Sequence, residues 1–202
     1  MKKRIIILTA VLALLVSCTH RVDVALRPDF GTQIQSGHYL ANIVPPMKFF
    51  MGEYRDKRPD PTMLATFKQQ VHTYNLYEER PMADALLDGL KALVVASKQE
   101  WSGMPDGDVK IDLTFINLQA ARNAGLISVG ATSSMQIKAD FVNAKTGELI
   151  YTNVYTGQDD RSQAMIGLMG MVKDSIDASI VRCIQSIGDD EALAKALAKI
   201  RS

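Results

Sequence analysis

Cys18, the residue best placed to carry chemistry, closes the sequence Leu-Val-Ser-Cys at positions 15–18. An apolar run from Ile5 to Val16 precedes it and follows three basic residues at positions 2–4. A basic start, an apolar run and a small residue have the layout of a secretory signal. The run is shorter than the ~20 residues that a helix needs to cross a hydrocarbon core. Residues 1–17 are therefore predicted to be a signal peptide that the cysteine follows directly.

This order of residues resembles the lipobox of bacterial lipoproteins. The resemblance implies cleavage between Ser17 and Cys18, and a Cys18 thiol that carries a diacylglycerol, with palmitate among the acyl chains. Each buried CH₂ contributes about 0.8 kcal/mol, so two or three chains hold a protein firmly on a bilayer. Aspartate after the cysteine marks inner-membrane retention in the enteric sorting rule, so Thr19 implies the outer membrane, facing the periplasm. The alternative is an ordinary signal peptide with a chance cysteine.

The remaining chain is close to neutral and has one further cysteine. Loss of the three basic residues of the signal takes the formal net charge from +1 to −2. Such a chain has no basic field for nucleic acid, so we predict no nucleic-acid partner. Cys183 is expected to be a buried small hydrophobe, with an intermolecular disulfide as the alternative. The histidines do not cluster with cysteines at metal-ligand spacing, so we predict no metal and no cofactor.

The sequence predicts a tether followed by one domain. Residues 18–42 lack clear periodicity and contain Pro28, Gly31 and Gly37, so they are interpreted as a lipidated N-terminus and tether. Residues 43–202 are predicted to form a single periplasmic α/β domain. Alternation predicts strands, and a repeat of three to four residues predicts helices. The expected elements are strands at 47–54, 70–77, 109–118, 135–141 and 148–156, and helices at 81–96, 162–188 and from 189.

Strands with one apolar and one polar face need helices on the apolar face only. The predicted fold is therefore α/β (α+β), a two-layer sandwich. Its sheet of about five strands is mixed or largely antiparallel, and helices pack on one face. The hairpin around the turn 143–147, Asn-Ala-Lys-Thr-Gly, is its best-supported local element.

The order of these features is similar to the YajG-type group of bacterial lipoproteins. The resemblance rests on Cys18, the strand ending in 54–58, the helix from Pro81, the strand 108–118, the hairpin 135–155 and the helix from Ala164. More distantly, the hairpin resembles periplasmic domains of the curli-channel, Pel-polysaccharide and penicillin-binding-protein-activator lipoproteins. Those families act through protein partners, several as rings. This chain lacks the segments of a curli-type barrel and the long spacer of an activator.

No catalytic constellation stands out in the chain. Asp159 and Asp160 are explained by helix capping, and neighbouring residues point apart in any case. Ser133, Ser134 and Ser162 lack the glycine elbow of hydrolases. We therefore expect no enzymatic activity. The cluster Arg55, Asp56, Lys57 and Arg58 is a candidate polar contact site for phosphate or a partner carboxylate. Its alternative is a solvated strand end with internal ion pairs.

Two apolar segments suggest contacts with a partner. One spans 124–131 and includes Leu126 and Ile127; the other spans 165–171 and includes Met165 and Met169. Methionine gives an adaptable binding surface, and exposed apolar patches mark contacts. The alternative is that the two segments pack on each other inside the domain.

These features predict a non-enzymatic lipoprotein anchored to the bacterial outer membrane through acylated Cys18. Its domain would bind a protein partner or form a homo-oligomer, in export or envelope assembly. The alternative is a periplasmic carrier of a small amphiphile such as a lipid or glycan, which would need a closed apolar cavity between sheet and helices.

Overall fold

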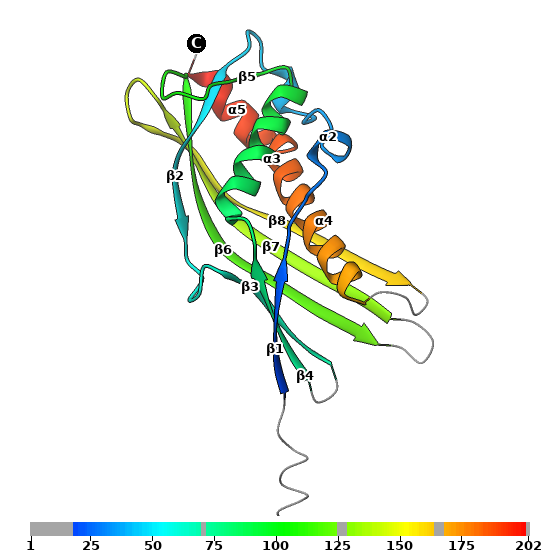
Figure 1. Cartoon of the computed structure of the whole chain (residues 1–202). Coiled ribbons are helices and arrows are strands. Elements are labelled where there is room, and N and C mark those ends of the chain that lie inside the picture. Colours follow the sequence, from blue (N-terminus) through cyan, green and yellow to red (C-terminus); the bar gives the residue numbers. More distant parts are fainter. Residues whose placement is uncertain (1–17, 70–71, 125–128, 164–167, 201–202) are drawn as a thin grey trace, which may run out of the picture.

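A five-stranded sheet and the helices that cover one of its faces form two layers (Figure 1). The computed structural model describes residues 18–69, 72–124, 129–163 and 168–200. The sheet has the strand order β5-β2-β6-β7-β8. Its pairings are parallel between β2 and both β5 and β6, and antiparallel from β6 to β8. The strands are β2 (Lys48–Asp56), β5 (Glu100–Trp101), β6 (Val109–Ala124), β7 (Val129–Asn143) and β8 (Leu149–Gln163).

A smaller sheet of three strands has the order β1-β4-β3. Strand β1 runs parallel to β4, and β3 runs antiparallel to β4. The small sheet contacts the main sheet where β3 lies against β6. Its strands are β1 (Cys18–Val24), β3 (Met63–Gln69) and β4 (His72–Glu78).

Helices α3, α4 and α5 lie on the same face of the main sheet (Figure 1). Helix α4 packs on β7 and β8, and α3 packs against α4. None of the helices in the described ranges has the length and hydropathy needed to cross a bilayer. The helical elements are α2 (Phe30–Gln33), the 3₁₀ turn η1 (Leu40–Asn42), α3 (Met82–Ala96), α4 (Leu168–Gly188) and α5 (Glu191–Lys199).

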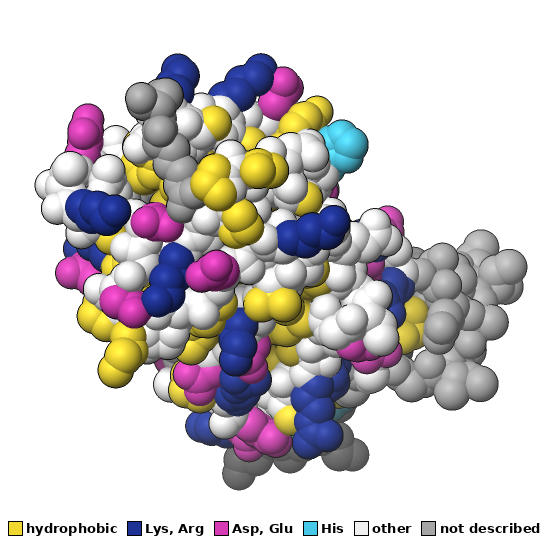
Figure 2. All heavy atoms as spheres, turned by 90° about the horizontal axis from the view of Figure 1, so that it is seen from above, with side chains coloured by type: hydrophobic (Ala, Val, Ile, Leu, Met, Phe, Trp, Pro, Cys, Tyr) yellow, Lys and Arg dark blue, Asp and Glu magenta, His cyan; other side chains and the backbone are white. Residues whose placement is uncertain are grey.

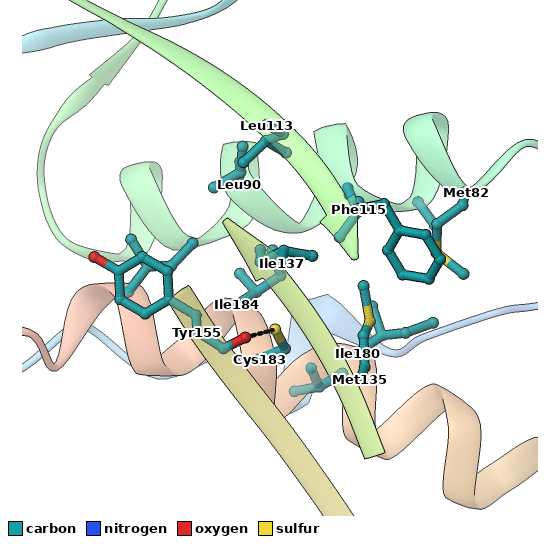
Figure 3. Close-up of a cluster of buried hydrophobic side chains, with 14 of the residues drawn as sticks. Met82, Leu90, Leu113, Phe115, Met135, Ile137, Tyr155, Ile180, Cys183 and Ile184 are labelled. Atoms are coloured by element: carbon teal, nitrogen blue, oxygen red, sulfur yellow. Dashed lines mark hydrogen bonds between the residues drawn. The ribbon is translucent and has the colours of Figure 1, made fainter. Parts of the chain in front are cut away.

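The core fills the space between the main sheet and the two long helices (Figure 3). Alternation along β6 places Val109, Ile111, Leu113 and Phe115 inward, each at most 1% exposed. Leu90 of α3 and Ile184 of α4 meet this face and are fully buried. Cys183 is also fully buried, and its Sγ lies 3.4 Å from the carbonyl oxygen of Tyr155. The two-layer fold with helices on one face, and the burial of Cys183, are therefore confirmed.

The structure differs from the tether expected at residues 18–42. Strand β1 starts at Cys18 and pairs with β4 along its whole length. Leu26, Ile34 and Leu40 are at most 8% exposed and join the core. Gly37 lies so close to Gly188, at the end of α4, that an added Cβ would come within 2.5 Å of the Gly188 Cα. This segment is therefore packed onto the domain.

The three long strands also exceed their predicted lengths. Strand β6 continues to Ala124, and β7 already begins at Val129, although the corresponding predicted strands ended at 118 and began at 135. Strand β8 runs to Gln163, so Asp159 and Asp160 are strand residues, and their expected role as helix caps is wrong. Ser162, near which the second long helix was expected to begin, is a strand residue of β8, and the described part of α4 spans Leu168–Gly188. Small residues such as Ala, Gly and Ser suit these strands because α4 packs closely on them.

Helix α5 is fixed to the sheet by Asp190, its N-cap. One Asp190 carboxylate oxygen accepts from the Ala192 and Leu193 amides at 2.9 and 3.0 Å. The other accepts from Asn153 Nδ2 at 3.0 Å and Tyr155 OH at 2.9 Å. Burial alone would raise the pKa of Asp190, but these hydrogen bonds outweigh it and hold the pKa below its ordinary value. The carboxylate thus joins β8 to α5.

Candidate anchoring site and partner-binding surfaces

Cys18 is exposed and is the first residue of β1. In the neighbouring strand β4, the residue paired with Cys18 is His72. Exposure falls along one face of β1, from the exposed Cys18 and His20 through half-buried Val22 to Val24, which is 9% exposed. The candidate acylation site therefore lies at the end of the small sheet, with no spacer between it and the folded domain.

The cluster Arg55–Arg58 divides into an exposed and a buried half. Arg55 is 71% exposed and pairs with Glu53, as a solvated strand end would. The Arg58 and Asp56 side chains are 6% and 11% exposed, with 2.6 Å between Arg58 Nη2 and Asp56 Oδ2. Glu78 of β4 lies 3.3 Å from the same Arg58 nitrogen and is 10% exposed.

This buried ion cluster (Asp56, Arg58 and Glu78) joins the two sheets. The Arg58 guanidinium also lies over the ring of Phe115, 4.5 Å from its centre, and donates to the Met63 carbonyl at 3.1 Å. Burial alone would raise the pKa of Asp56, but hydrogen bonds from Arg58 keep it below its ordinary value. Burial raises the pKa of Glu78 despite the nearby Arg58 charge. With these contacts Arg58 has a structural role, and Arg55 and Lys57 are the members of the sequence-predicted cluster that are exposed to solvent.

Asp159 and Asp160 point to opposite faces of β8. The Asp159 side chain is 3% exposed, and its carboxylate oxygens lie 2.6 Å from Arg161 Nε and 2.9 Å from Arg182 Nη2. Arg182 of α4 also donates to the Gln158 carbonyl. Asp160 is exposed on the other face. The pair therefore has no shared geometry for acid–base chemistry, and Asp159 ties α4 to the sheet.

The sheet face away from the helices has a polar hollow that the sequence interpretation missed. Gln119, Ser134 and Gln158 form one cross-strand row across β6, β7 and β8. Thr132 and Asp160 belong to the next row. The hollow of about 510 Å³ that these residues line is also bordered by Ala121, Ser133, Asp159 and, from α4, Arg182. The sequence does contain the alternation typical of a strand here, because polar residues alternate with Ala131, Ser133 and Met135. The high content of glycine, alanine and serine hid this pattern.

Exposed apolar residues gather at the end opposite Cys18. Residues 43–47, the loop after β5, and α5 lie at this end (Figure 1). Val44 and Met104 are 84% and 69% exposed. Each borders a hollow: about 310 Å³ between Val44 and α5, and about 540 Å³ between Met104, Trp101 and α3. Figure 2 looks onto this end and shows hydrophobic side chains among separate basic and acidic ones.

Of the apolar contact residues predicted from the sequence, Leu126, Ile127 and Met165 lie outside the described residues, as does the side chain of Met169. The partner-contact hypothesis for these four residues stays a prediction. The space where a carrier would need its cavity is occupied, in the described part, by large buried side chains such as Phe115, Phe141 and Leu86.

Comparison with known proteins shows the fold. No family model and no curated protein matches the chain. Among solved structures, protein XCC0632 from Xanthomonas campestris, of the DUF330 family model, has a TM-score of 0.61 at 8% identity, covering 89% of this chain and 99% of that one. A minor lipoprotein from Acinetobacter baumannii (TM-score 0.39, 12% identity, 76% and 94% covered) and a PelC dodecamer from Paraburkholderia phytofirmans (0.33, 8%, 69% and 87%) are more distant.

The last two likenesses are too low to support an inference about this chain, and the first supports the fold alone. The finer resemblance to the YajG-type group stays a prediction. What the comparisons establish is that this chain shares the two-layer fold of the Xanthomonas protein over almost all of that protein's length.

Proposed function

We propose that this protein is a lipoprotein held in the outer membrane by acylated Cys18, with its domain in the periplasm. In this proposal it is a non-enzymatic module that binds a partner protein or a second copy of itself. The position of Cys18 carries the proposal: the cysteine that ends the lipobox-like sequence is exposed and begins the folded domain. A lipid on this sulfur meets no obstruction from the core.

Anchoring at one end supports a role in binding at the other. Confinement to a membrane raises the effective concentration of a module for partners on the same surface. Val44, Met104 and their hollows lie at the end opposite β1, so the anchor directs them away from the bilayer. Exposed apolar side chains next to hollows are typical of protein contacts. The polar clusters around Arg58, Asp159 and Asp190 hold elements of the fold together, which supports the non-enzymatic assignment.

Cys18→Ala is expected to release the protein from the membrane. The variant has no thiol at the anchoring position, so radiolabelled palmitate should not be incorporated and the protein should leave the membrane fraction. Cys183→Ala is the matched control. The Cys183 thiol is fully buried and should carry no lipid, so this variant should incorporate palmitate and sediment with the membrane as the native protein does. Unchanged labelling and sedimentation of Cys18→Ala would contradict the proposal.

Photo-crosslinking in cells tests the binding surface. A crosslinking residue in place of Val44 or Met104 should give adducts, whose mass distinguishes a second copy from another protein. Val154 is the control, since it is 48% exposed but lies in the middle of β8, on the helix-free face. Adducts from position 154 alone, or from none of the three positions, would rule out the distal end as the partner surface.

A further inference from the structure

Cys18 is held close to the folded domain, because β1 is paired with β4 from this residue onward. Successive residues of a strand rise about 3.3 Å, so His20 and its partner Tyr74 lie about 7 Å along the strand from the anchor. The headgroup layer on each side of a bilayer is about 5–8 Å thick. If β1 remains paired, the acyl chains cannot reach the hydrocarbon core without bringing these residues to the membrane surface.

A ladder of rings keeps this end of the sheet paired. We call it the ring ladder: His20, His72, Tyr74 and Phe67. The His20 Nε2 and His72 Nδ1 atoms are 2.9 Å apart. The rings of His20 and Tyr74 stack with 5.1 Å between centres, as do those of Tyr74 and Phe67. Phe67 is 3% exposed and joins the ladder to the core. These contacts oppose fraying of β1, which would otherwise supply slack.

The ring ladder and the Cys18 sulfur share one face of the sheet. Side chains alternate along a strand, so those of Cys18 and His20 point the same way, and Cα pairing places those of His72 and Tyr74 beside them. His20 is exposed, and His72 and Tyr74 are half-buried. Rings with an apolar body and a polar edge favour the membrane interface. On the opposite face Arg21, whose side chain is 67% exposed, lies over the Tyr77 ring and pairs with Asp23.

We propose that His20, His72 and Tyr74 rest among the phospholipid headgroups, with Arg21 beside them, and that this contact fixes the orientation of the domain on the membrane. The inference rests on the proposed function, because it needs the lipid on Cys18. It adds to the lipid anchor a second contact, which restricts rotation of the domain about that anchor. The exposed side of the ring ladder thus contacts the lipid surface.

Fluorescence quenching tests the contact, since Trp101 is the only tryptophan and lies at the distal end. The full-length protein is expressed, purified in its lipidated form and reconstituted into phosphatidylethanolamine–phosphatidylglycerol vesicles that carry headgroup nitroxides. In the Tyr74→Trp, Trp101→Phe variant, we expect quenching of about twofold, because the reporter lies within the headgroup layer. The unaltered protein, with Trp101 alone, is the control and should not be quenched.

A second reporter guards against a folding defect. Thr73→Trp in the Trp101→Phe background places the probe on the opposite face, one residue closer to the anchor, and should also be quenched. Tyr77→Trp lies about 16 Å along the strand and should be quenched less. Lipidated, vesicle-bound and folded variants without quenching at positions 73 and 74 would overturn this inference alone. Protein that carries no lipid by mass spectrometry, or does not float with the vesicles, would overturn the proposed function instead.

Discussion

Replacement of Arg58 by methionine is expected to lower the free energy of unfolding by about 3–5 kcal/mol. The variant keeps a long side chain over Phe115 but leaves Asp56 and Glu78 without their shared cation. Both carboxyl groups are about nine-tenths buried, so water cannot replace the lost partner. The Glu78 Oε2 atom already has no hydrogen-bond partner among the described residues, so the cluster has little reserve. Urea denaturation followed by circular dichroism at pH 7 measures the loss.

The loss of stability caused by Arg58→Met should be smaller at acidic pH. The pKa of Asp56 lies below its ordinary value of 3.8, so its favourable contribution is present above that pH and lost as the pH falls through the lowered pKa. The pKa of Glu78 lies above 4.5, so its contribution is present below 4.5 and lost as the pH rises through the raised pKa. Without Arg58 both groups fold best when protonated. The difference between the native protein and the variant is therefore largest near neutral pH.

Arg55→Met is the matched control for this prediction. Its partner Glu53 is 63% exposed, so loss of the pair should change stability by no more than about 0.5 kcal/mol. Equal effects of the two substitutions would show that the buried ion cluster does not join the two sheets.

Gly157→Ala is expected to cost about 3 kcal/mol, at the upper end for overpacking. A Cβ at Gly157 would lie 1.9 Å from the Ser179 carbonyl oxygen and 2.4 Å from the Cys183 amide nitrogen. Both atoms belong to the backbone of α4 and cannot rotate away. The methyl group must therefore push α4 from β8, which also disturbs the contact between Cys183 and Tyr155. The unfolding midpoint in urea and the near-ultraviolet circular dichroism report the loss.

Gly170→Ala, in the same helix, controls for the backbone effect of adding a methyl group. Among the residues that the structure describes, no atom lies within 4 Å of a Cβ at this position, and the residue is exposed. Alanine favours a helix over glycine by about 1 kcal/mol, so this variant should be at least as stable as the native protein. A Gly157→Ala variant as stable as Gly170→Ala would refute close packing of α4 on β8.

The sequence predicted the elements whose burial follows a regular pattern. Strand β6 shows an apolar residue at every second position from Val109 to Phe115, and α3 shows a helical repeat from Met82 to Val94. The turn at 143–147 joins β7 to β8 as expected, and Gly147 there has a φ of 75°, which glycine adopts without strain. Local sequence patterns were sufficient to predict these elements because each has one solvent-exposed side and one buried side.

Elements that depend on distant partners could not be predicted this way. Strand β1 is mostly polar because only its inner face meets the core, and its partner β4 lies far along the chain. Asp159 resembles a helix cap in the sequence, but in the structure its carboxylate pairs with Arg182 of another element. Internal ion pairs at Arg58 and Asp56 were expected only as the alternative to a contact site, and at a solvated strand end. The structure instead buries the pair, and Glu78 reaches it only through the small sheet. Burial of charge is a property of the folded arrangement, so a local window does not reveal it.

The parallel pairing of β1 with β4 from Cys18 onward also sets an order of events during biogenesis. Proteolytic enzymes act on accessible chain that is free of sheet hydrogen bonds. On the proposed route, cleavage and acylation at Cys18 must therefore precede the addition of β1 to the small sheet, whose other strands come later in synthesis. Precursor that completed the sheet too early would conceal its own processing site. Closure of β1 would then serve as the step that separates mature protein from immature protein.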